Sequence, residues 1–158
     1  LWDALADRFR ANKVGLGALG GGNHFRDARA PYDGDALHFL VHTGSRSESG
    51  HVDALVERPD DFDREFDRVV AWAADNRAAI HDEIAAVFGK LDLVLDLPHN
   101  TYEPLADGGA VIRKGSVRLE PGELSVIPSH LSGDVVLVRA TERVNDTLNS
   151  LSHGTGRA

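Results

Sequence analysis

The sequence contains no cysteine. Disulfide bonds and thiolate metal sites both require cysteine, so this chain can supply neither of them. Any metal ion that the chain binds must therefore be held by histidine nitrogens or by oxygen atoms.

Long hydrophobic runs and an excess of positive charge are also missing. No apolar run approaches the roughly 20 residues that cross a bilayer, and the N-terminus lacks the basic-then-apolar pattern of a signal peptide. We therefore expect a cytoplasmic protein without a membrane partner. The formal net charge of −8 argues against a sequence-independent nucleic-acid coat, which needs many Lys or Arg contacts to phosphate. An RNA partner would have to be bound locally, at a defined site.

What is present is typical of one globular domain. The chain has 158 residues, of which 42% are hydrophobic and 27% charged, enough apolar material to bury a core. We find no internal repeat or long linker and expect a single domain over residues 1–158. The first residue is Leu1 and the last motif stops at Ala158, so we interpret the chain as part of a longer protein.

The spacing of apolar residues predicts two helices and several short strands. Residues 1–12 have the pattern of the end of an amphipathic helix, and residues 60–88 that of one long helix. Asp60 or Asp61 can cap the long helix and Gly89 can terminate it. Strands are predicted at residues 36–41, 91–97, 109–112, 124–127 and 134–139. Strands grouped around one long helix, without regular alternation, favour an α+β fold.

Eight histidines occur, and their surroundings divide them into two groups. Those in small-residue or polar loops, where a side chain can face a cleft, are His24, His42, His99 and His153. Neutral imidazole is the commonest metal ligand near neutral pH. For any one of these loop histidines an ordinary structural role is the more common outcome. The remaining ones, which alternate within a strand or lie on presumed polar faces, are His38, His51, His81 and His130.

The neighbours of the loop histidines strengthen a functional interpretation. Glycines precede His24, and their lack of a side chain allows the backbone to approach a ligand closely. His42 is followed by two hydroxyl residues and Arg46, a combination suited to phosphate, because Arg can pair with phosphate oxygens bidentately. His153 is likewise followed by glycines and Arg157. Beside Lys114, Arg113 would ordinarily form part of a solvated surface pair.

Taken together, these segments resemble the signature motifs of the RtcB RNA ligases. The matching strings are LGGGNHF at residues 19–25, VHTGSR at 41–46, HN at 99–100, RKGS at 113–116, PGELSVIP at 121–128 and SHGTGR at 152–157. They occur in the family's order and span residues 15–157, nearly the whole chain.

This resemblance implies a catalytic domain with a mixed β-sheet core and flanking helices. It also implies an enzyme that uses manganese, two ions in the family, and GTP to join an RNA 3′-phosphate or 2′,3′-cyclic phosphate end to a 5′-hydroxyl end in tRNA splicing or RNA repair. His24, His42 and His99 match the family's metal ligands, and His153 matches its nucleophile, which carries GMP covalently. We expect the three metal-binding histidines to converge on one cleft.

Further positions match residues of the family that contact nucleotide or RNA. The nucleotide-binding matches are Asn23, Asp27, Gly154, Thr155 and Gly156. The matches that hold RNA or phosphate are Arg46, Asn100, Lys114 and Arg157. A few fixed cations in a cleft can act strongly despite a negative net charge, because low-dielectric walls focus their field. A protein partner that activates the enzyme is left open.

Three departures from the family's pattern leave other functions open. The family also uses an aspartate and a cysteine before the position of Leu1, and a guanine-closing lysine after Ala158, so we expect the isolated chain to be inactive. Residues 129–132 also differ from the family's serine-containing string. One alternative is a metal-dependent phosphoesterase or nucleotidyl hydrolase, since histidines around a metal can also activate water. Another is a non-catalytic subunit that binds RNA ends.

Overall fold

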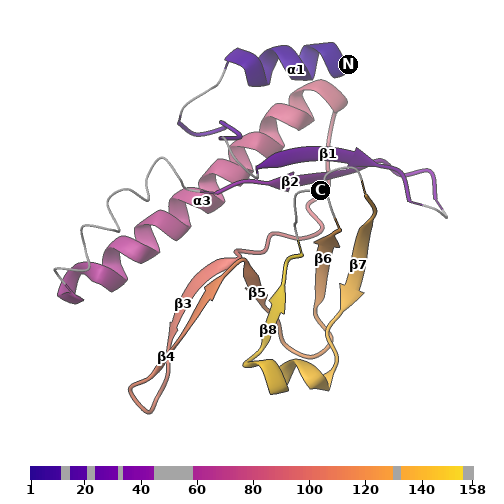
Figure 1. Ribbon diagram of the computed structural model, residues 1–158. Coiled ribbons are helices and arrows are strands. Elements are labelled where there is room, and N and C mark those ends of the chain that lie inside the picture. Colours follow the sequence, from indigo (N-terminus) through magenta and orange to yellow (C-terminus); the bar gives the residue numbers. More distant parts are fainter. Residues whose placement is uncertain (12–14, 21–23, 32–33, 45–58, 130–132, 155–158) are drawn as a thin grey trace. The chain divides into compact units, whose positions relative to one another are not determined.

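Figure 1 presents a computed structural model of the chain, which describes residues 1–11, 15–20, 24–31, 34–44, 59–129 and 133–154. The chain divides into two compact units, Leu1–Asp92 and Leu93–Ala158, and each is considered by itself. The expectation of one catalytic domain over the whole chain stays a prediction.

The described part of the first unit contains two helices and one pair of strands. They are α1 (Trp2–Ala11), β1 (Phe25–Arg29), β2 (His38–His42) and α3 (Pro59–Phe88). Both helices lie where the apolar spacing predicts them. The helix α3 ends as expected at Gly89, whose φ of +92° is open to glycine and whose amide donates to the Ala85 carbonyl at 2.8 Å.

The core of the first unit forms where α1 lies along the C-terminal part of α3 (Figure 1). Leu5 and Phe9 of α1 are buried against Ile80 and Ile84 of α3. Partly buried side chains of the strand β2 and of the end of α3 pack around this cluster; they include Phe39, Val41, Val87 and Phe88. The hydrophobic faces of both helices thus provide a support for the β1–β2 pair.

The strands β1 and β2 are antiparallel, with Phe25 opposite His42 and Arg29 opposite His38. The apolar run at residues 36–41 predicts β2, whereas no pattern in the sequence predicts its partner β1. Since the strands run in opposite directions, the start of β1 lies beside the end of β2. This register brings the residue before β1, His24, close to the last residue of β2, His42.

Within its described residues, the second unit consists of short strands and one 3₁₀ helix. These elements are β3 (Asn100–Pro104), β4 (Ala110–Lys114), β5 (Ser116–Arg118), β6 (Leu124–Pro128), β7 (Val135–Arg139), η2 (Glu142–Thr147) and β8 (Ser150–Ser152). They pair antiparallel as β3–β4, β5–β8 and β6–β7. Helices and small antiparallel sheets agree with the α+β class. Among the described strands, however, the expected mixed sheet is replaced by separate two-stranded antiparallel sheets.

The predicted strand at residues 91–97 is wrong. These residues are described and adopt no regular secondary structure. Leu93 is 70% exposed and Val94 is 64% exposed, so side chains with high β propensity here lie in solvent. A strand is stabilised by cross-strand pairs, and local propensity alone does not supply them.

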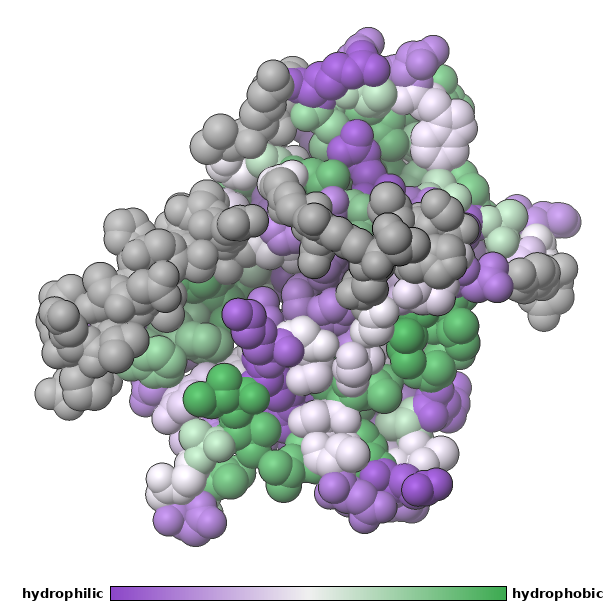
Figure 2. Space-filling view, in the orientation of Figure 1, coloured by the Kyte–Doolittle hydropathy of each residue, from purple (hydrophilic) through white to green (hydrophobic). Residues whose placement is uncertain are grey.

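The second unit has a small core and an apolar surface. Val117, Leu119 and Val144 are buried together, whereas Ile112 and Leu137 are exposed on β4 and β7. Figure 2 shows hydrophobic side chains reaching the surface at several separate places. Within the described part of the chain, no helix combines the length and hydrophobicity that a membrane span requires.

Candidate functional site

His24 and His42 form a pair in the first unit. Their ring centroids are 5.8 Å apart and the ring planes meet at 75°, an edge-on arrangement. Both rings are partly buried, and Phe25 lies beside His42 with a centroid distance of 5.3 Å. The β1–β2 register explains the pairing, because it joins the chain segments on which the two histidines lie.

Two glycines make room for the ring of His24. A Cβ atom at Gly20 would lie only 2.7 Å from His24 Nδ1, and one at Gly44 would lie 3.3 Å from His24 Nε2. Gly20 also has a φ of +80°, which other L-residues rarely adopt. The glycines of two separate motifs therefore allow close approach to the imidazole from two directions.

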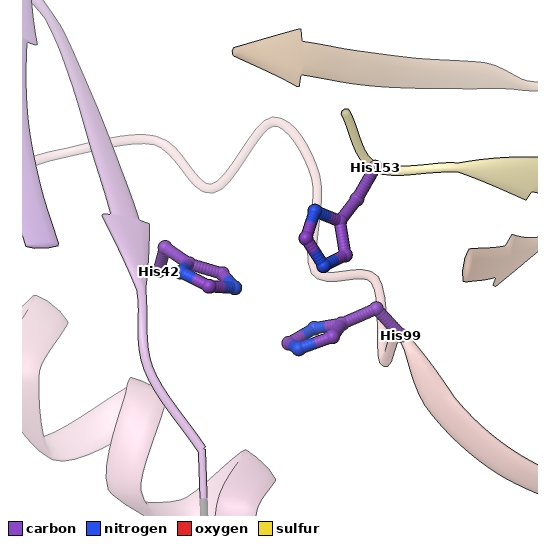
Figure 3. A group of neighbouring side chains, drawn as sticks. All are labelled: His42, His99 and His153. Carbon is purple, nitrogen blue, oxygen red and sulfur yellow. The ribbon is translucent and has the colours of Figure 1, made fainter. Parts of the chain in front are cut away.

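His99 and His153 form a second pair, within the second unit. Their centroids are 4.7 Å apart at an interplanar angle of 82°, and Figure 3 shows the two rings turned toward each other. His99 directly precedes β3 and His153 directly follows β8. Both are partly buried. Each unit thus contributes two imidazoles at the ends of its strands, and whether the two pairs converge on one cleft stays a prediction.

Gly115 links the segments that carry His99 and His153. The amide of His153 donates to the Gly115 carbonyl at 3.1 Å, and the amide of the next residue, Ser116, donates to the His99 carbonyl at 3.1 Å. A Cβ at Gly115 would lie 3.3 Å from His153 Nε2, and its φ is +71°. The glycine of the RKGS string therefore has a structural role beneath the histidine pair.

Asn100 and Lys114 are opposite each other in the β3–β4 register, next to His99. The Oδ1 atom of Asn100 accepts a hydrogen bond from the Gly115 amide at 3.1 Å, and both side chains belong to exposed residues. Directly opposed residues of an antiparallel pair point to the same face. The two predicted phosphate-binding residues of this unit thus lie together.

Arg113 is not the surface cation that the sequence suggests. It is 3% exposed, and its guanidinium donates to Ser150 Oγ at 2.9 Å, to Glu103 Oε2 at 2.7 Å and to the Leu148 carbonyl at 2.8 Å. These bonds connect β4 and β3 to the segment that leads into β8. Arg113 and Lys114 alternate along the strand, so one is buried and the other exposed.

Glu103 is the common acceptor of two arginines. Besides Arg113, it accepts a hydrogen bond from Arg118 at 3.3 Å. The hydrogen bond from Arg113 lowers the pKa of the Glu103 carboxyl most; burial opposes this effect, and Arg118 lowers the pKa further. The carboxylate raises the pKa of Arg118 in turn. These ion pairs connect β3, which carries Glu103, to β4 through Arg113 and to β5 through Arg118.

Asp27, predicted to contact nucleotide, lies in the middle of β1 and is engaged locally. Its Oδ2 atom accepts a hydrogen bond from Arg29 Nε at 2.6 Å, and its Oδ1 atom accepts one from the Ala28 amide at 2.9 Å. Its position on the hairpin that ends in the His24–His42 pair agrees with a role near that pair, but the nucleotide contact stays a prediction.

The other predicted site residues are only partly described. Gly154 follows His153 and has a φ of +75°. Lying outside the described residues are Asn23, Arg46, Thr155, Gly156 and Arg157. Of the remaining histidines, His38 is exposed, and His81 is half-buried on α3 with its Nδ1 atom 3.3 Å from Asp82.

A buried polar pair that was not predicted from the sequence lies beneath the first histidine pair. Asn76 of α3 is 1% exposed and Thr43 is 2% exposed, and they lie in hydrogen-bond contact at 3.3 Å. A polar residue on the apolar side of a helical pattern was the available signal, because a buried amide is costly unless it is hydrogen-bonded.

Comparison with known proteins identifies one relative. The chain is 34% identical to a protein named RNA-splicing ligase RtcB2 from Escherichia coli strain ATCC 25922, over 90% of its own length. It covers 45% of that protein, so it spans less than half the length of the relative. No protein-family model and no solved structure matches the chain. Over nearly all of its own length, the chain is therefore similar to part of a protein named as an RtcB-type RNA-splicing ligase.

Proposed function

We propose that the protein containing this chain is an RNA ligase that uses GTP and manganese to join a 3′-phosphate or 2′,3′-cyclic phosphate end to a 5′-hydroxyl end. The observation that best supports this proposal is that imidazoles from the matched motifs pair within each unit. His24 pairs with His42, and His99 pairs with His153. The identity to a protein named RNA-splicing ligase RtcB2 supports the reaction class.

The two histidine pairs offer the type of donor atom that binds a divalent metal ion. Each offers imidazole nitrogens that are partly buried, and glycines at Gly20, Gly44 and Gly115 keep bulky side chains away from them. We propose His24, His42 and His99 as ligands. Imidazole binds zinc, copper, iron and nickel readily, whereas manganese favours additional oxygen donors. The choice of manganese rests on the resemblance of the motifs. Bound metal would neutralise charge on the pyrophosphate leaving group.

In this proposal His153 is the nucleophile. A neutral imidazole nitrogen attacks the α-phosphorus of GTP, a nitrogen–phosphorus bond forms, and the bond to pyrophosphate breaks as pyrophosphate leaves. The close neighbour His99 restricts the orientation of the His153 ring. The hydrogen bond from the His153 amide to the Gly115 carbonyl fixes the backbone from which the ring projects. Such fixed geometry favours in-line attack.

The later steps transfer and release GMP. An oxygen of the RNA 3′-phosphate attacks the GMP phosphorus, and the bond to His153 breaks. The RNA 5′-hydroxyl then attacks the activated 3′-phosphate, losing its proton as GMP departs, and a phosphodiester bond results. Lys114 and Asn100 lie next to His99 on one face of the β3–β4 pair, where a cation and an amide can hold phosphate oxygens.

The decisive experiment is to map covalent GMP in the full-length protein. Incubation with α-labelled GTP and manganese should place acid-labile label on the protein, and peptide mapping should locate it on His153. The His153→Ala variant should lose the label while manganese binding is largely retained. His38→Ala, at the exposed start of β2, is the matched control and should keep it.

The alternatives predict other results. Label on a different side chain would contradict the role of His153. Release of free GMP without any adduct would favour a hydrolase, and nucleotide affinity that does not depend on metal would favour a non-catalytic subunit.

A further inference from the structure

Asn76 is a buried polar side chain in the middle of the long helix α3. It is 1% exposed, on a helix face whose neighbours one turn away include Ile80, which is 0% exposed. Asparagine is a poor helix former, and its amide costs free energy when buried unless its hydrogen bonds are satisfied. We therefore expect the Asn76 amide to make hydrogen bonds that an aliphatic side chain could not make.

The amide of Asn76 joins two segments that are far apart in sequence. Its Oδ1 atom accepts a hydrogen bond from the Gly17 amide at 2.7 Å, and its Nδ2 atom donates to the Ala18 carbonyl at 3.1 Å. The same Nδ2 atom donates to Thr43 Oγ1 at 3.3 Å. Thr43 in turn donates to the Leu19 carbonyl at 2.9 Å.

Both segments lead directly to the first histidine pair. Residues 17–19 precede Gly20, where an added Cβ would meet the ring of His24, and Thr43 stands between His42 and Gly44. The hydrogen bonds therefore fix the backbone on both sides of the His24 ring and at the exit of β2. A rigid helix carries the group that sets the distance between the two segments.

We propose that Asn76 is the positioning residue of the His24–His42 pair, acting through Gly17, Ala18 and Thr43. The proposal itself concerns only how Asn76 holds the rings of His24 and His42 together. That this positioning serves metal binding rests on the proposed function. Groups that orient metal ligands in this way typically change metal affinity by about 10–100-fold when they are lost.

The test compares Asn76→Leu with Ile84→Ala in the full-length protein. Ile84 is on the same helix and is 2% exposed, but none of the hydrogen bonds to Gly17, Ala18 or Thr43 depends on it. The readout, in a histidine-labelled sample well below its unfolding temperature, is the nuclear Overhauser contact between the rings of His24 and His42. Asn76→Leu should lose this contact and the exchange protection of the Gly17 amide. Ile84→Ala should lower stability while keeping both.

A second pair of variants keeps the proposal testable if Asn76→Leu does not fold. Thr43→Val removes the hydroxyl with little change in shape, and Thr43→Ser retains it. Valine should weaken the ring contact and serine should preserve it. An inter-ring contact that survives in Asn76→Leu, or in Thr43→Val when Asn76→Leu cannot be obtained, would overturn the proposal.

A manganese titration tests the proposed metal site separately from the positioning role of Asn76. Adding Mn²⁺ should broaden the His24 and His42 signals in the wild-type protein, and Asn76→Leu should need at least roughly tenfold more metal for the same effect. If wild-type signals do not respond to metal, the proposed metal site fails, while the ring contact still decides whether Asn76 positions the pair.

Discussion

Arg113 shows how much a single buried cation can contribute in a small unit. Its guanidinium donates to a carboxylate, a hydroxyl and a backbone carbonyl, and the residue is 3% exposed. Removing Arg113 leaves the Ser150 hydroxyl and the Leu148 carbonyl without this donor, and leaves Glu103 with Arg118 alone. The lost partners lie on β3, on the chain entering β8 and in β8 itself, which His153 directly follows.

We expect Arg113→Met to lower the free energy of unfolding by about 2–4 kcal/mol, because three charge-assisted hydrogen bonds are lost with only part of the packing retained. Urea denaturation would measure the change. Arg118→Met is the matched control, since Arg118 shares Glu103 but its side chain is 46% exposed, and its effect should be clearly smaller. Equal losses in both variants would contradict the importance of burial.

Glu103 gives the second unit a dependence on pH. Its pKa is lower in the folded chain than the ordinary value of 4.5, mainly because Arg113 donates a hydrogen bond to the carboxylate. The ionised form therefore stabilises the fold at neutral pH. This contribution is lost as the pH falls from about 4.5 through the folded-state pKa.

Denaturation midpoints measured between neutral and acidic pH should consequently fall less steeply in Glu103→Gln than in the wild-type protein. Glu103→Gln should be less stable at neutral pH, and the two curves should approach each other in acid. Asp146→Asn, an exposed carboxyl on η2, should leave the wild-type slope unchanged. Parallel curves for Glu103→Gln and wild type would show that the cluster does not contribute to the pH dependence.

At the scale of elements, the candidate site depends on turns and strand ends. Gly20 and Gly89 both have positive φ, +80° and +92°, so alanine introduces backbone strain at either position. Only Gly20 also lies against a histidine: its Cβ would meet His24 Nδ1, whereas around Gly89 the described residues place nothing within 4 Å. Alanine substitutions at the two positions therefore distinguish the effect of backbone strain from the effect of displacing the His24 ring.

We expect Gly89→Ala and Gly20→Ala each to lower stability by about 1–2 kcal/mol through strain. Only Gly20→Ala should also weaken metal binding, by roughly tenfold or more, because the His24 ring must move. Thermal unfolding and metal titration of the full-length protein would measure the two effects. Similar metal affinities in both variants would mean that the His24 ring does not need its present position.

At the scale of the molecule, the prediction concerns the two units. One metal centre built from His24, His42 and His99 requires ligands from both of them. A metal that binds only the folded state stabilises it by about 2.7 kcal/mol at a concentration of 100 times Kd. Manganese should therefore slow amide exchange in both units together, as followed by mass spectrometry.

The variant His99→Ala should remove this protection from the first unit as well as from the second, although His99 lies in the second unit. His38→Ala, an exposed histidine at the start of β2, is the control and should leave the protection intact. Protection confined to one unit in the wild-type protein would indicate that the histidine pairs serve separate sites.

The sequence by itself determined the elements that depend on local pattern. The helix α3 follows from its apolar spacing, and Gly89 ends it because a positive φ suits glycine. The loop histidines were also recognisable, since small residues and glycines surround them. The interpretation of the motifs as those of RNA ligases needed no structure, and the identity to the Escherichia coli relative agrees with it.

Only the tertiary structure decided which segments meet. Residues 91–97 have strand propensity but form no strand, while β1 forms because it pairs with β2. Neither the burial of Arg113 nor the link from Asn76 to Thr43 can be deduced from spacing, because both depend on partners distant in sequence. Periodicity reports which face of an element is apolar, whereas strand register and buried hydrogen bonds arise from the cooperative packing of the whole unit.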